Sequence, residues 1–595
     1  MCGINVIINP DSDSHKAIEL MMHATMHRGP DHSGFSKVGE NVSFAGNRLK
    51  ILDLSETSNQ PIWNKEKDAV LVWNGAIYNY QDLRNELLDL GCEFKGSSDS
   101  EVLLYWLQKF GTGKIDSLKG MFAFAFADLK KKQVIIARDF SGEKPLYFLH
   151  EGNNWYFSSE TKGILAGNKA QCPIDGQQFI PYFYYRHSFP DSTFFKQIRQ
   201  VLPGEILVLD FSGAILERQN LDIPYFQPYK INQSIFEETL KDAVLKNFNA
   251  ERPVGMVLSG GADSSLLYSL WYEETGQPLN TFTVVLEKKY QTKYNDPYFT
   301  KYLAKKYPSF HHEISVSQSD VRDNWPEYIQ SMDQPIGDSA GFLTWFVAKT
   351  AKEKVKVLIS GAGADELFGG YNRHRAYWHY LQNPDLLKIL KKVAPNFLFP
   401  PPWKKVLESI HHNSDLTFIQ MAALQTIPDE HIGEFQKWYP KHENPFKNAL
   451  EWDRTFYLVN DILKIHDNAC MAHGIEGRSP YLDMDLLAMV YAESENNMDN
   501  LIGKKFIKTA LQTRGLSKIA NRKKLGFGLP LSEWFEEIEF RHWVFDPIME
   551  MEKIWGQEFP AEMRKLAANP EKSEKRQFLQ LWNLFILASW LKNKE

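Results

Sequence analysis

The second residue of the chain, Cys2, has a side chain and a position that suit a nucleophile. A small second residue permits removal of Met1, and the thiol would then stand beside the α-amino group of its own residue. An α-amino group titrates at about pH 8, so it is a suitable base for a thiol at neutral pH. A buried structural cysteine is the alternative interpretation, and position alone leaves both open.

A second group of residues has the types that bind phosphate. The run at 259–265 (SGGADSS) follows the apolar segment VGMVL and precedes a segment of helical character. A glycine- and serine-rich turn before a helix presents free N–H groups and the positive end of the helix dipole to an anion. Asp263 has the carboxylate that Mg²⁺ would need. The run lacks the lysine of the GxxxxGK[ST] loop, which argues against a kinase or GTPase, and a plain surface turn is the alternative.

The first two hundred residues contain the elements that must position Cys2. β-branched and aromatic content, or alternation, predicts strands, and apolar residues at helical spacing predict helices. The expected strands are 4–8, 42–47, 69–73, 122–126, 133–137 and 155–158, and the expected helices are 14–27, 80–90 and 100–109. Two layers of sheet flanked by helices would accommodate this order.

A different rhythm begins after a polar, proline-bearing stretch at 211–231, which we predict to be a linker. Strands alternate with helices there, which favours a parallel sheet with ligands at the carboxyl ends of its strands. The expected strands are 254–258, 281–285, 311–315 and 355–360, and the expected helices are 232–248 and 297–307. After residue 370 the sequence predicts mostly helix and no clear sheet.

Composition narrows the class of protein. With 595 residues the chain is too long for one hydrophobic core, and 43% hydrophobic and 24% charged residues exclude wholly disordered and collagen-like chains. A net charge of −6 gives no footprint for nucleic acid, and no apolar run approaches the roughly 18 residues that span a bilayer. Four widely spaced cysteines and the absence of a signal-peptide pattern lead us to expect a reducing, cytoplasmic location.

The motifs that follow Cys2 resemble those of the class II, N-terminal-nucleophile glutamine amidotransferases. They occur in order over about residues 1–165 as HRGPD (27–31), RLKILD (48–53), NGAIYN (74–79), SDSE (98–101), GMFAFAFAD (120–128), ARDFSGEKPLY (137–147) and SSETKGIL (158–165). The resemblance implies that Cys2 attacks glutamine and that Asn74 and Gly75 stabilise the oxyanion. It also implies that Arg48 holds the α-carboxylate of glutamine and Asp99 its α-amino group.

The second half of the chain resembles ATP pyrophosphatases, and over most of 235–540 the glutamine-hydrolysing asparagine synthetases. The motifs are SGGADSS, SGAGADELFGGY (360–371), MAHGIEGRSPYLD (471–483), GKKFIK (503–508) and NRKKLGFGLP (521–530). By resemblance, ATP or pyrophosphate is bound by Leu258, Ser259, Gly260, Gly261, Asp263, Ser264, Ser265, Val284, Ser360, Gly361 and Lys505. Asp263 and Asp365 would share Mg²⁺, and Lys505 would neutralise the departing phosphates.

Two departures from these families bear on the substrates. Ala76 stands where an acidic residue usually helps to hold the amino group of glutamine, so we expect weaker glutamine affinity. Ala362 stands where many asparagine synthetases have an acidic residue, and Glu366 or an acid from 476–483 would have to replace it unless the acceptor differs from aspartate. An amidotransferase for another carboxylate is therefore the alternative function, and a degenerate binding protein is a remoter one.

The expected organisation is α/β throughout. An αββα N-terminal-nucleophile glutaminase domain (1–210) and a linker (211–231) precede a doubly wound parallel α/β ATP-pyrophosphatase domain (232–595), with a helical extension from about 372. We expect a ligase that uses ATP and Mg²⁺, takes glutamine and aspartate, passes ammonia through a buried passage, and binds neither nucleic acid nor membrane. Family resemblance suggests a homodimer.

Overall fold

Two six-stranded antiparallel sheets lie face to face in the N-terminal part of the chain. The computed structural model describes residues 2–8, 14–168, 172–221, 230–291, 293, 296–393, 400–493, 495–523 and 526–594. One sheet has the order β10-β8-β9-β1-β3-β2, built from β10 (Ile198–Gln200), β8 (Tyr147–Glu151), β9 (Asn154–Ser158), β1 (Cys2–Ile8), β3 (Val42–Arg48) and β2 (His32–Lys37). The other has the order β12-β11-β7-β6-β5-β4, built from β12 (Ile215–Asn220), β11 (Glu205–Asp210), β7 (Gln133–Arg138), β6 (Gly120–Asp128), β5 (Ala69–Ile77) and β4 (Ile62–Trp63).

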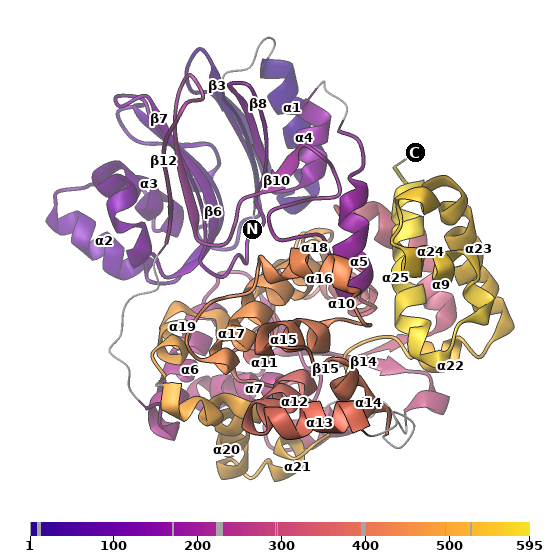
Figure 1. Cartoon of the computed structure of the whole chain (residues 1–595). Helices are drawn as coiled ribbons and strands as arrows, with labels where there is room; N and C mark the ends of the chain where they lie inside the picture. The colour runs from indigo at the N-terminus through magenta and orange to yellow at the C-terminus, as the bar shows by residue number, and fades with distance from the viewer. Residues whose placement is uncertain are drawn as a thin grey trace.

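Helices cover the outer face of each sheet (Figure 1). The helices α1 (Ser14–Ala24) and α4 (Thr161–Gly167) pack on the sheet that contains β1, and α2 (Tyr80–Asp89) and α3 (Asp99–Phe110) lie on the side of the sheet that contains β5. This arrangement confirms the predicted αββα architecture.

The alternating sequence of β6, GMFAFAFAD, explains how these layers fit together. Successive side chains of a strand point to opposite faces. Phe122, Phe124 and Phe126 therefore belong to the core beneath α2 and α3, whereas the alanines between them belong to the core between the two sheets. Small alanines let the sheets approach, and the large rings fill the wider space beneath the helices.

A five-stranded sheet with only parallel pairings forms the centre of the second part of the chain. Its order is β15-β14-β13-β16-β17, built from β15 (Phe310–Val316), β14 (Asn280–Leu286), β13 (Val254–Val257), β16 (Val357–Ile359) and β17 (Glu476–Arg478). The crossovers contain α7 (Ala262–Thr275), α8 (Asp296–Ala304), α9 (Gln318–Ser331) and α10 (Ala340–Ala351), and α6 (Gln233–Phe248) precedes β13. Strand order reverses between β13 and β16, and a ligand crevice is expected at such a switch point.

The remainder of the described chain is helical, as predicted from about residue 372. It comprises α11 (Ala364–Leu367), α12 (Asn372–Gln382), α13 (Pro384–Val393), α14 (Pro401–Glu408), α15 (Ser414–Ala422), α16 (Asp429–Gln436), α17 (Pro445–Trp452), a π-helical segment (Asp453–Ile462), α18 (Leu463–Met471), α19 (Met484–Tyr491), α20 (Lys505–Thr513), α21 (Ser517–Ala520), α22 (Leu531–Trp534), α23 (Ile538–Trp555), α24 (Ala561–Ala568) and α25 (Phe578–Lys592). The apolar α25 packs against α5 (Phe179–Tyr185), α9, α23 and α24 (Figure 1). In the part of the chain that the structure describes, no helix is both long and apolar enough to cross a bilayer.

Two boundaries differ from the sequence prediction. The predicted linker at 211–231 is wrong in its first half, because β12 pairs with β11 and extends the N-terminal sheet to Asn220. This edge strand exposes Ile215 and Leu216, so it lacks the buried alternating pattern of an inner strand. Residues 222–229 of the linker lie outside the described residues. The prediction of no sheet after residue 370 also missed β17, whose three residues carry two buried charges instead of a β-branched run.

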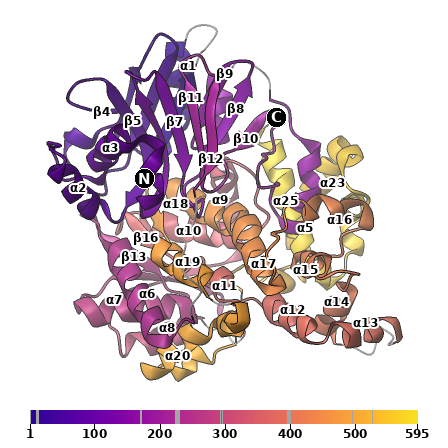
Figure 2. The ribbon, with the colours of Figure 1, turned by 60° about the vertical axis from the view of Figure 1, so that its left-hand side comes forward.

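Figure 2 shows the N-terminal sheets stacked on the second domain, with α10, α18 and β16 beneath them. Polar contacts cross this boundary. The Lys144 ammonium donates to the carbonyl of Gly477 at 3.1 Å, and the Asp333 carboxylate accepts from the Thr161 hydroxyl at 2.9 Å. The start of α4 in one domain and the edge strand β17 of the other are thus held by direct hydrogen bonds between domains.

Candidate active site

The nucleophile predicted from sequence lies at the first residue of β1, in register with Arg48 of β3. Cys2 is buried, and its backbone N–H donates to Asn74 Oδ1 at 2.9 Å. Gln60 Nε2 donates to Cys2 Sγ at 3.2 Å. Burial raises the pKa of the Cys2 thiol, although the Arg48 charge acts in the opposite direction. The thiol therefore needs a base before it can attack.

Asn74 and Gly75, the predicted oxyanion donors, lie on β5 beside this thiol. Asn74 Nδ2 is buried without a hydrogen-bond partner, so an amide donor is available next to the nucleophile. Gly75 sits against β6 so closely that an added Cβ would lie 2.0 Å from the carbonyl oxygen of Met121. Only glycine fits there, and the close packing fixes the backbone N–H that is predicted to bind the oxyanion.

Arg48 is held by the loop that follows its strand. Its Nη1 donates to the Ser55 carbonyl at 2.7 Å and to Asn59 Oδ1 at 3.0 Å, while Nη2 donates to the carbonyls of Leu52 and Asp53. Neutral acceptors orient the guanidinium without neutralising its charge. Arg48 therefore keeps the positive charge that an α-carboxylate would bind.

Asp99, the predicted partner of the glutamine amino group, begins α3 and accepts from the Ile77 N–H at 3.2 Å. This bond ties Asp99 to the strand that carries Asn74. Burial raises the pKa of Asp99 to about 6, and the nearby Glu476 adds to this increase. Ala76, which follows Gly75 on the same strand, is buried and supplies no acidic group. The structure thus brings Cys2, Arg48 and Asn74 together directly, and Asp99 through β5.

Two residues of this site were missed in the sequence analysis. Gln60 contacts the thiol and also exchanges hydrogen bonds with the backbone of Trp73, at 2.8 and 2.7 Å. Nothing in the sequence around Gln60 marks it as a site residue. Arg28 lies within the HRGPD motif and donates from Nε to the Cys2 carbonyl at 3.3 Å. The HRGPD motif marks the position of Arg28, but the sequence does not show that the arginine side chain binds the Cys2 backbone.

The predicted phosphate loop connects β13 to α7, as the sequence indicates. Gly260 has φ +63°, and an added Cβ would lie 2.8 Å from Phe299 Cβ and 2.9 Å from the Asp296 carbonyl oxygen. Gly261 caps α7, so the N–H groups of the first helical turn face the loop. The hydroxyls of Ser259 and Ser264 lie 3.3 Å apart across it. Gly260 therefore meets both the conformational and the steric requirement of an anion-binding turn.

The second predicted loop, which follows β16, lies against the first. An added Cβ at Gly361 would lie 3.2 Å from Asp263 Cβ, and Ser360 is anchored by its N–H, which donates to the Arg478 carbonyl at 3.0 Å. Leu258 and Val284, the predicted adenine contacts, are buried at the ends of the neighbouring strands β13 and β14. The switch point of the sheet thus joins the predicted nucleotide residues in one place.

Lys504, and not the predicted Lys505, lies between the two carboxylates predicted to hold Mg²⁺. The Lys504 ammonium lies 2.6 Å from Asp263 Oδ2 and 2.7 Å from Asp365 Oδ1, and its side chain is only 7% exposed. The Lys505 side chain is 55% exposed and pairs with Asp499 at 3.2 Å. Gly503 and Lys504 have positive φ and turn the chain just before α20, so adjacent lysines point in different directions. Spacing within GKKFIK does not distinguish them.

Asp263 and Asp365 are arranged in a way that fits a Mg²⁺ ion bound together with phosphate. Both carboxylates reach one ammonium, and Asp263 Oδ1 is buried without a hydrogen-bond partner. Mg²⁺ commonly takes one or two carboxylates plus phosphate oxygens and water. In the described residues no cluster of three or more His, Cys, Asp or Glu side chains suits a metal ion. These two carboxylates would therefore suit a Mg²⁺ ion that takes its other ligands from phosphate and water.

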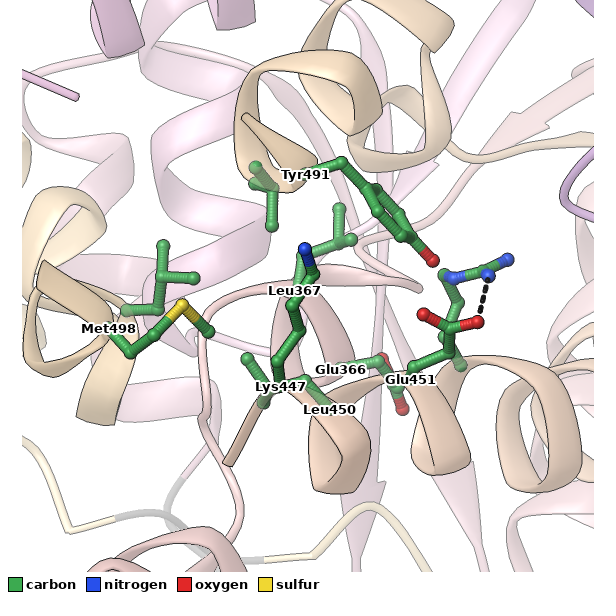
Figure 3. A pocket seen from close by; sticks show the side chains of 10 residues that line it. Glu366, Leu367, Lys447, Leu450, Glu451, Tyr491 and Met498 are labelled. Atoms are coloured by element: carbon green, nitrogen blue, oxygen red, sulfur yellow. Dashed lines mark ion pairs between the residues drawn. The ribbon is translucent and has the colours of Figure 1, made fainter. Parts of the chain in front are cut away.

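Ala362 packs in an apolar cluster with Leu458, Ile462, Leu463 and Leu482. Glu366, one suggested replacement for the missing acid, is buried and accepts from the Tyr371 hydroxyl at 2.5 Å. Burial raises the pKa of Glu366 to about 7. Its side chain lines a pocket together with Lys447, Glu451, Tyr491 and Met498 (Figure 3). Ser360, Gly361 and Ala362 do not line that pocket. The replacement of the missing acid by Glu366 stays a prediction.

Known protein families match both halves of the chain. Residues 236–592 match the family described as Asparagine synthase, and residues 1–219 match the Glutamine amidotransferase domain. The chain belongs to the asparagine synthase family. Both matches agree with the division of the structure into a two-layer antiparallel domain and a parallel-sheet domain.

Two relatives of this asparagine synthase family member match most of the chain, and a third matches a smaller part of it. Asparagine synthetase [glutamine-hydrolyzing] 1 of Bacillus subtilis (strain 168) is 28% identical over 593 residues, which cover 92% of this chain and 90% of the relative. Asparagine synthetase [glutamine-hydrolyzing] 3 of the same organism is 30% identical over 514 residues, which cover 82% and 81%. A putative asparagine synthetase 2 of Methanocaldococcus jannaschii is 32% identical over 399 residues, which cover 63% and 76%.

Proposed function

We propose that the protein converts glutamine, aspartate, ATP and water into asparagine, glutamate, AMP and pyrophosphate. The observation that carries this proposal is that one chain contains two sites, one suited to nucleophilic attack and one suited to binding phosphate. One has a buried thiol beside an unsatisfied amide donor, and the other has two glycine loops beside a lysine and two aspartates. The family to which the chain belongs supports the same reaction.

In the first half-reaction, the Cys2 thiol loses its proton to the α-amino group that removal of Met1 exposes. The thiolate attacks the side-chain amide of glutamine, and the oxyanion accepts hydrogen bonds from Asn74 Nδ2 and the Gly75 N–H. Ammonia leaves as the thioester forms, and water then releases glutamate. Arg48 binds the α-carboxylate and Asp99 the α-ammonium group, so the side-chain amide is presented to the thiol.

In the second half-reaction, the side-chain carboxylate of aspartate attacks the α-phosphate of ATP, and pyrophosphate leaves. The N–H groups at the start of α7 and the hydroxyls of Ser259, Ser264 and Ser265 bind the phosphates, and Lys504 offsets the charge that grows on the leaving group. Mg²⁺, held by Asp263 and Asp365, would supply further positive charge at the phosphate oxygens. Ammonia then attacks the acyl-adenylate, which releases asparagine and AMP.

Transfer of ammonia inside the protein joins the two half-reactions. Ammonia in bulk water at neutral pH is mostly protonated and is then no nucleophile, so release into a closed space preserves its reactivity. Hydrogen bonds between the domains, such as Lys144 to Gly477 and Thr161 to Asp333, hold the two domains in the direct contact that such a transfer would need. We further propose that the enzyme is cytoplasmic and forms a homodimer. Sedimentation of the purified protein would test the homodimer.

The assay that tests the proposal follows pyrophosphate and asparagine in a mixture of glutamine, Mg-ATP and aspartate. Pyrophosphate that depends on aspartate, with matching asparagine, is the expected result. Glutaminase activity without any response to aspartate would show that another carboxylate is the acceptor. Absence of both activities from protein with a processed N-terminus would refute the catalytic function.

A further inference from the structure

A buried arginine connects the nucleophile to the opposite domain. The Arg28 guanidinium has no exposure to solvent and makes three separate contacts. Its Nε donates to the Cys2 carbonyl at 3.3 Å, Nη1 donates to Glu160 Oε1 at 2.9 Å, and Nη2 lies 2.8 Å from Asp467 Oδ2. Cys2 and Glu160 belong to the glutaminase domain, whereas Asp467 lies on α18 of the synthetase domain.

The end of β1 depends on this arginine because one neighbouring strand stops short. β3 pairs with β1 along its whole length from Cys2, but β9 pairs only from Asn5 onward. The Cys2 carbonyl therefore lacks a strand partner on the side of β9, and Arg28 donates to it. Arg28 thus fixes the carbonyl of Cys2, while Asn74 and Gln60 bind its N–H and its thiol.

Asp467 has no comparable alternative partner. It is buried, and Arg28 is its ion-pair partner within the described part of the chain. Glu160, in contrast, also pairs with His27 at 3.0 Å and Lys162 at 2.7 Å. Although burial raises it, these positive neighbours hold the pKa of Glu160 well below its usual range. Charge is thus balanced around Glu160 without Asp467, so the ion pair with Asp467 is an added tie between domains.

Asp467 also stands close in the fold to the ATP-binding elements. Its helix α18 packs against β17, and the Arg478 carbonyl at the end of β17 accepts from the N–H of Ser360 in the second nucleotide loop. A short path of packed elements therefore runs from that loop through α18 and Arg28 to the backbone of the nucleophile.

We propose that Asp467 is a positioning residue for glutamine hydrolysis that the synthetase domain contributes. Through Arg28 it holds the Cys2 backbone so that the thiol faces the amide donor of Asn74. Glutamine hydrolysis then depends on correct docking of the synthetase domain. Asp467 itself acts through Arg28 and does not contact glutamine. The proposal rests on the function proposed for Cys2.

The test is the full-length Asp467→Asn variant, assayed for glutamine hydrolysis and, separately, for asparagine synthesis from ammonium chloride. We expect kcat for hydrolysis to fall roughly 10- to 100-fold, as misplacement of a reacting group does, with KM for glutamine changed less than about twofold. Ammonia-dependent synthesis should stay at the wild-type rate. Arg28→Lys should show the same pattern, and the double variant should lose no more than the worse single variant.

A matched control separates positioning from general loosening of the interface. Lys119 and Asp485 form another ion pair between the domains, at 2.6 Å, far from Cys2 in sequence and without contact to it. Asp485→Asn should leave glutamine hydrolysis unchanged, and Asp467→Glu should recover part of kcat. Wild-type hydrolysis in Asp467→Asn, or an equal loss in Asp485→Asn, would overturn the inference. If wild-type protein itself hydrolyses no glutamine, the proposed function of Cys2 fails instead.

Discussion

The Asn74 side chain brings two polar groups to the first site. Its oxygen accepts from the Cys2 backbone N–H, and its Nδ2 group is buried without a hydrogen-bond partner. Unsatisfied buried donors are costly in a folded protein unless a ligand or transition state uses them.

We predict that Asn74→Ala lowers kcat for glutamine hydrolysis about 10²- to 10³-fold, the usual cost of one oxyanion donor. Ammonia-dependent synthesis should be retained because the second site is untouched. Steady-state assays with either nitrogen source measure both rates. Unchanged glutamine hydrolysis would mean that the oxyanion is stabilised elsewhere.

The raised pKa of Asp99 predicts a pH dependence of glutamine binding. Because burial raises the pKa of Asp99 to about 6, the carboxylate is protonated and uncharged below that pH. An uncharged carboxyl no longer attracts the α-ammonium group of glutamine. Below about pH 6, kcat/KM for glutamine should fall up to tenfold per pH unit. The Asp99→Asn variant should have a low kcat/KM that no longer falls below pH 6. If the fall at low pH persists in this variant, another group causes it.

Two adjacent lysines provide a paired test of the second site. Lys504→Met should lower ATP-dependent synthesis at least about 10²-fold, because the ammonium beside Asp263 and Asp365 is lost. Lys505→Met removes only an exposed pair with Asp499 and should change the rate less than about twofold. Pyrophosphate release measures both. The reverse order of effects would restore the assignment made from sequence.

At the scale of elements, close packing around Gly370 keeps the cation and the carboxylates together. A Cβ at this position would lie 2.0 Å from Asp365 Oδ1 and 2.2 Å from Lys504 Cε. Gly370→Ala should therefore displace both groups and lower ATP-dependent synthesis at least about tenfold, with normal glutaminase activity. Gly433 of α16 has no neighbour within 4 Å of an added Cβ, so Gly433→Ala should keep full activity and gain up to about 1 kcal/mol of stability. Equal activity of the two variants would contradict this account.

Elements with strong periodicity were predictable from sequence, and those governed by long-range contacts were not. The Phe–Ala alternation of β6 and the apolar run of β13 identified both strands and placed them correctly. By contrast, β17 is a strand because β16 offers it an edge, and Glu476 and Arg478 give no local signal of it. Gln60 reaches Cys2 only through the fold, and the difference between Lys504 and Lys505 depends on a local turn. Residue types thus predicted the chemistry of the two sites, whereas tertiary contacts determined which residues, such as Gln60 and Lys504, belong to them.

At the scale of the whole molecule, the two sites depend on a polar interface. Arg28, Lys144 and Asp333 each join the glutaminase domain to the synthetase domain while remaining buried. Such contacts need exact geometry to repay the cost of desolvation, so they favour one docked arrangement over sliding. A fixed arrangement is what the proposed transfer of ammonia between the domains would need.

The most direct test of the central claim follows the nitrogen atom. Wild-type protein and Cys2→Ala are each supplied with aspartate, Mg-ATP and either glutamine labelled with ¹⁵N in its side-chain amide or ¹⁵N-ammonium, and labelled asparagine is measured by mass spectrometry. Wild-type protein should make labelled asparagine from both sources, and Cys2→Ala only from ammonium. Label from glutamine in the asparagine made by Cys2→Ala, or glutamate release by wild-type protein without labelled asparagine, would contradict the account.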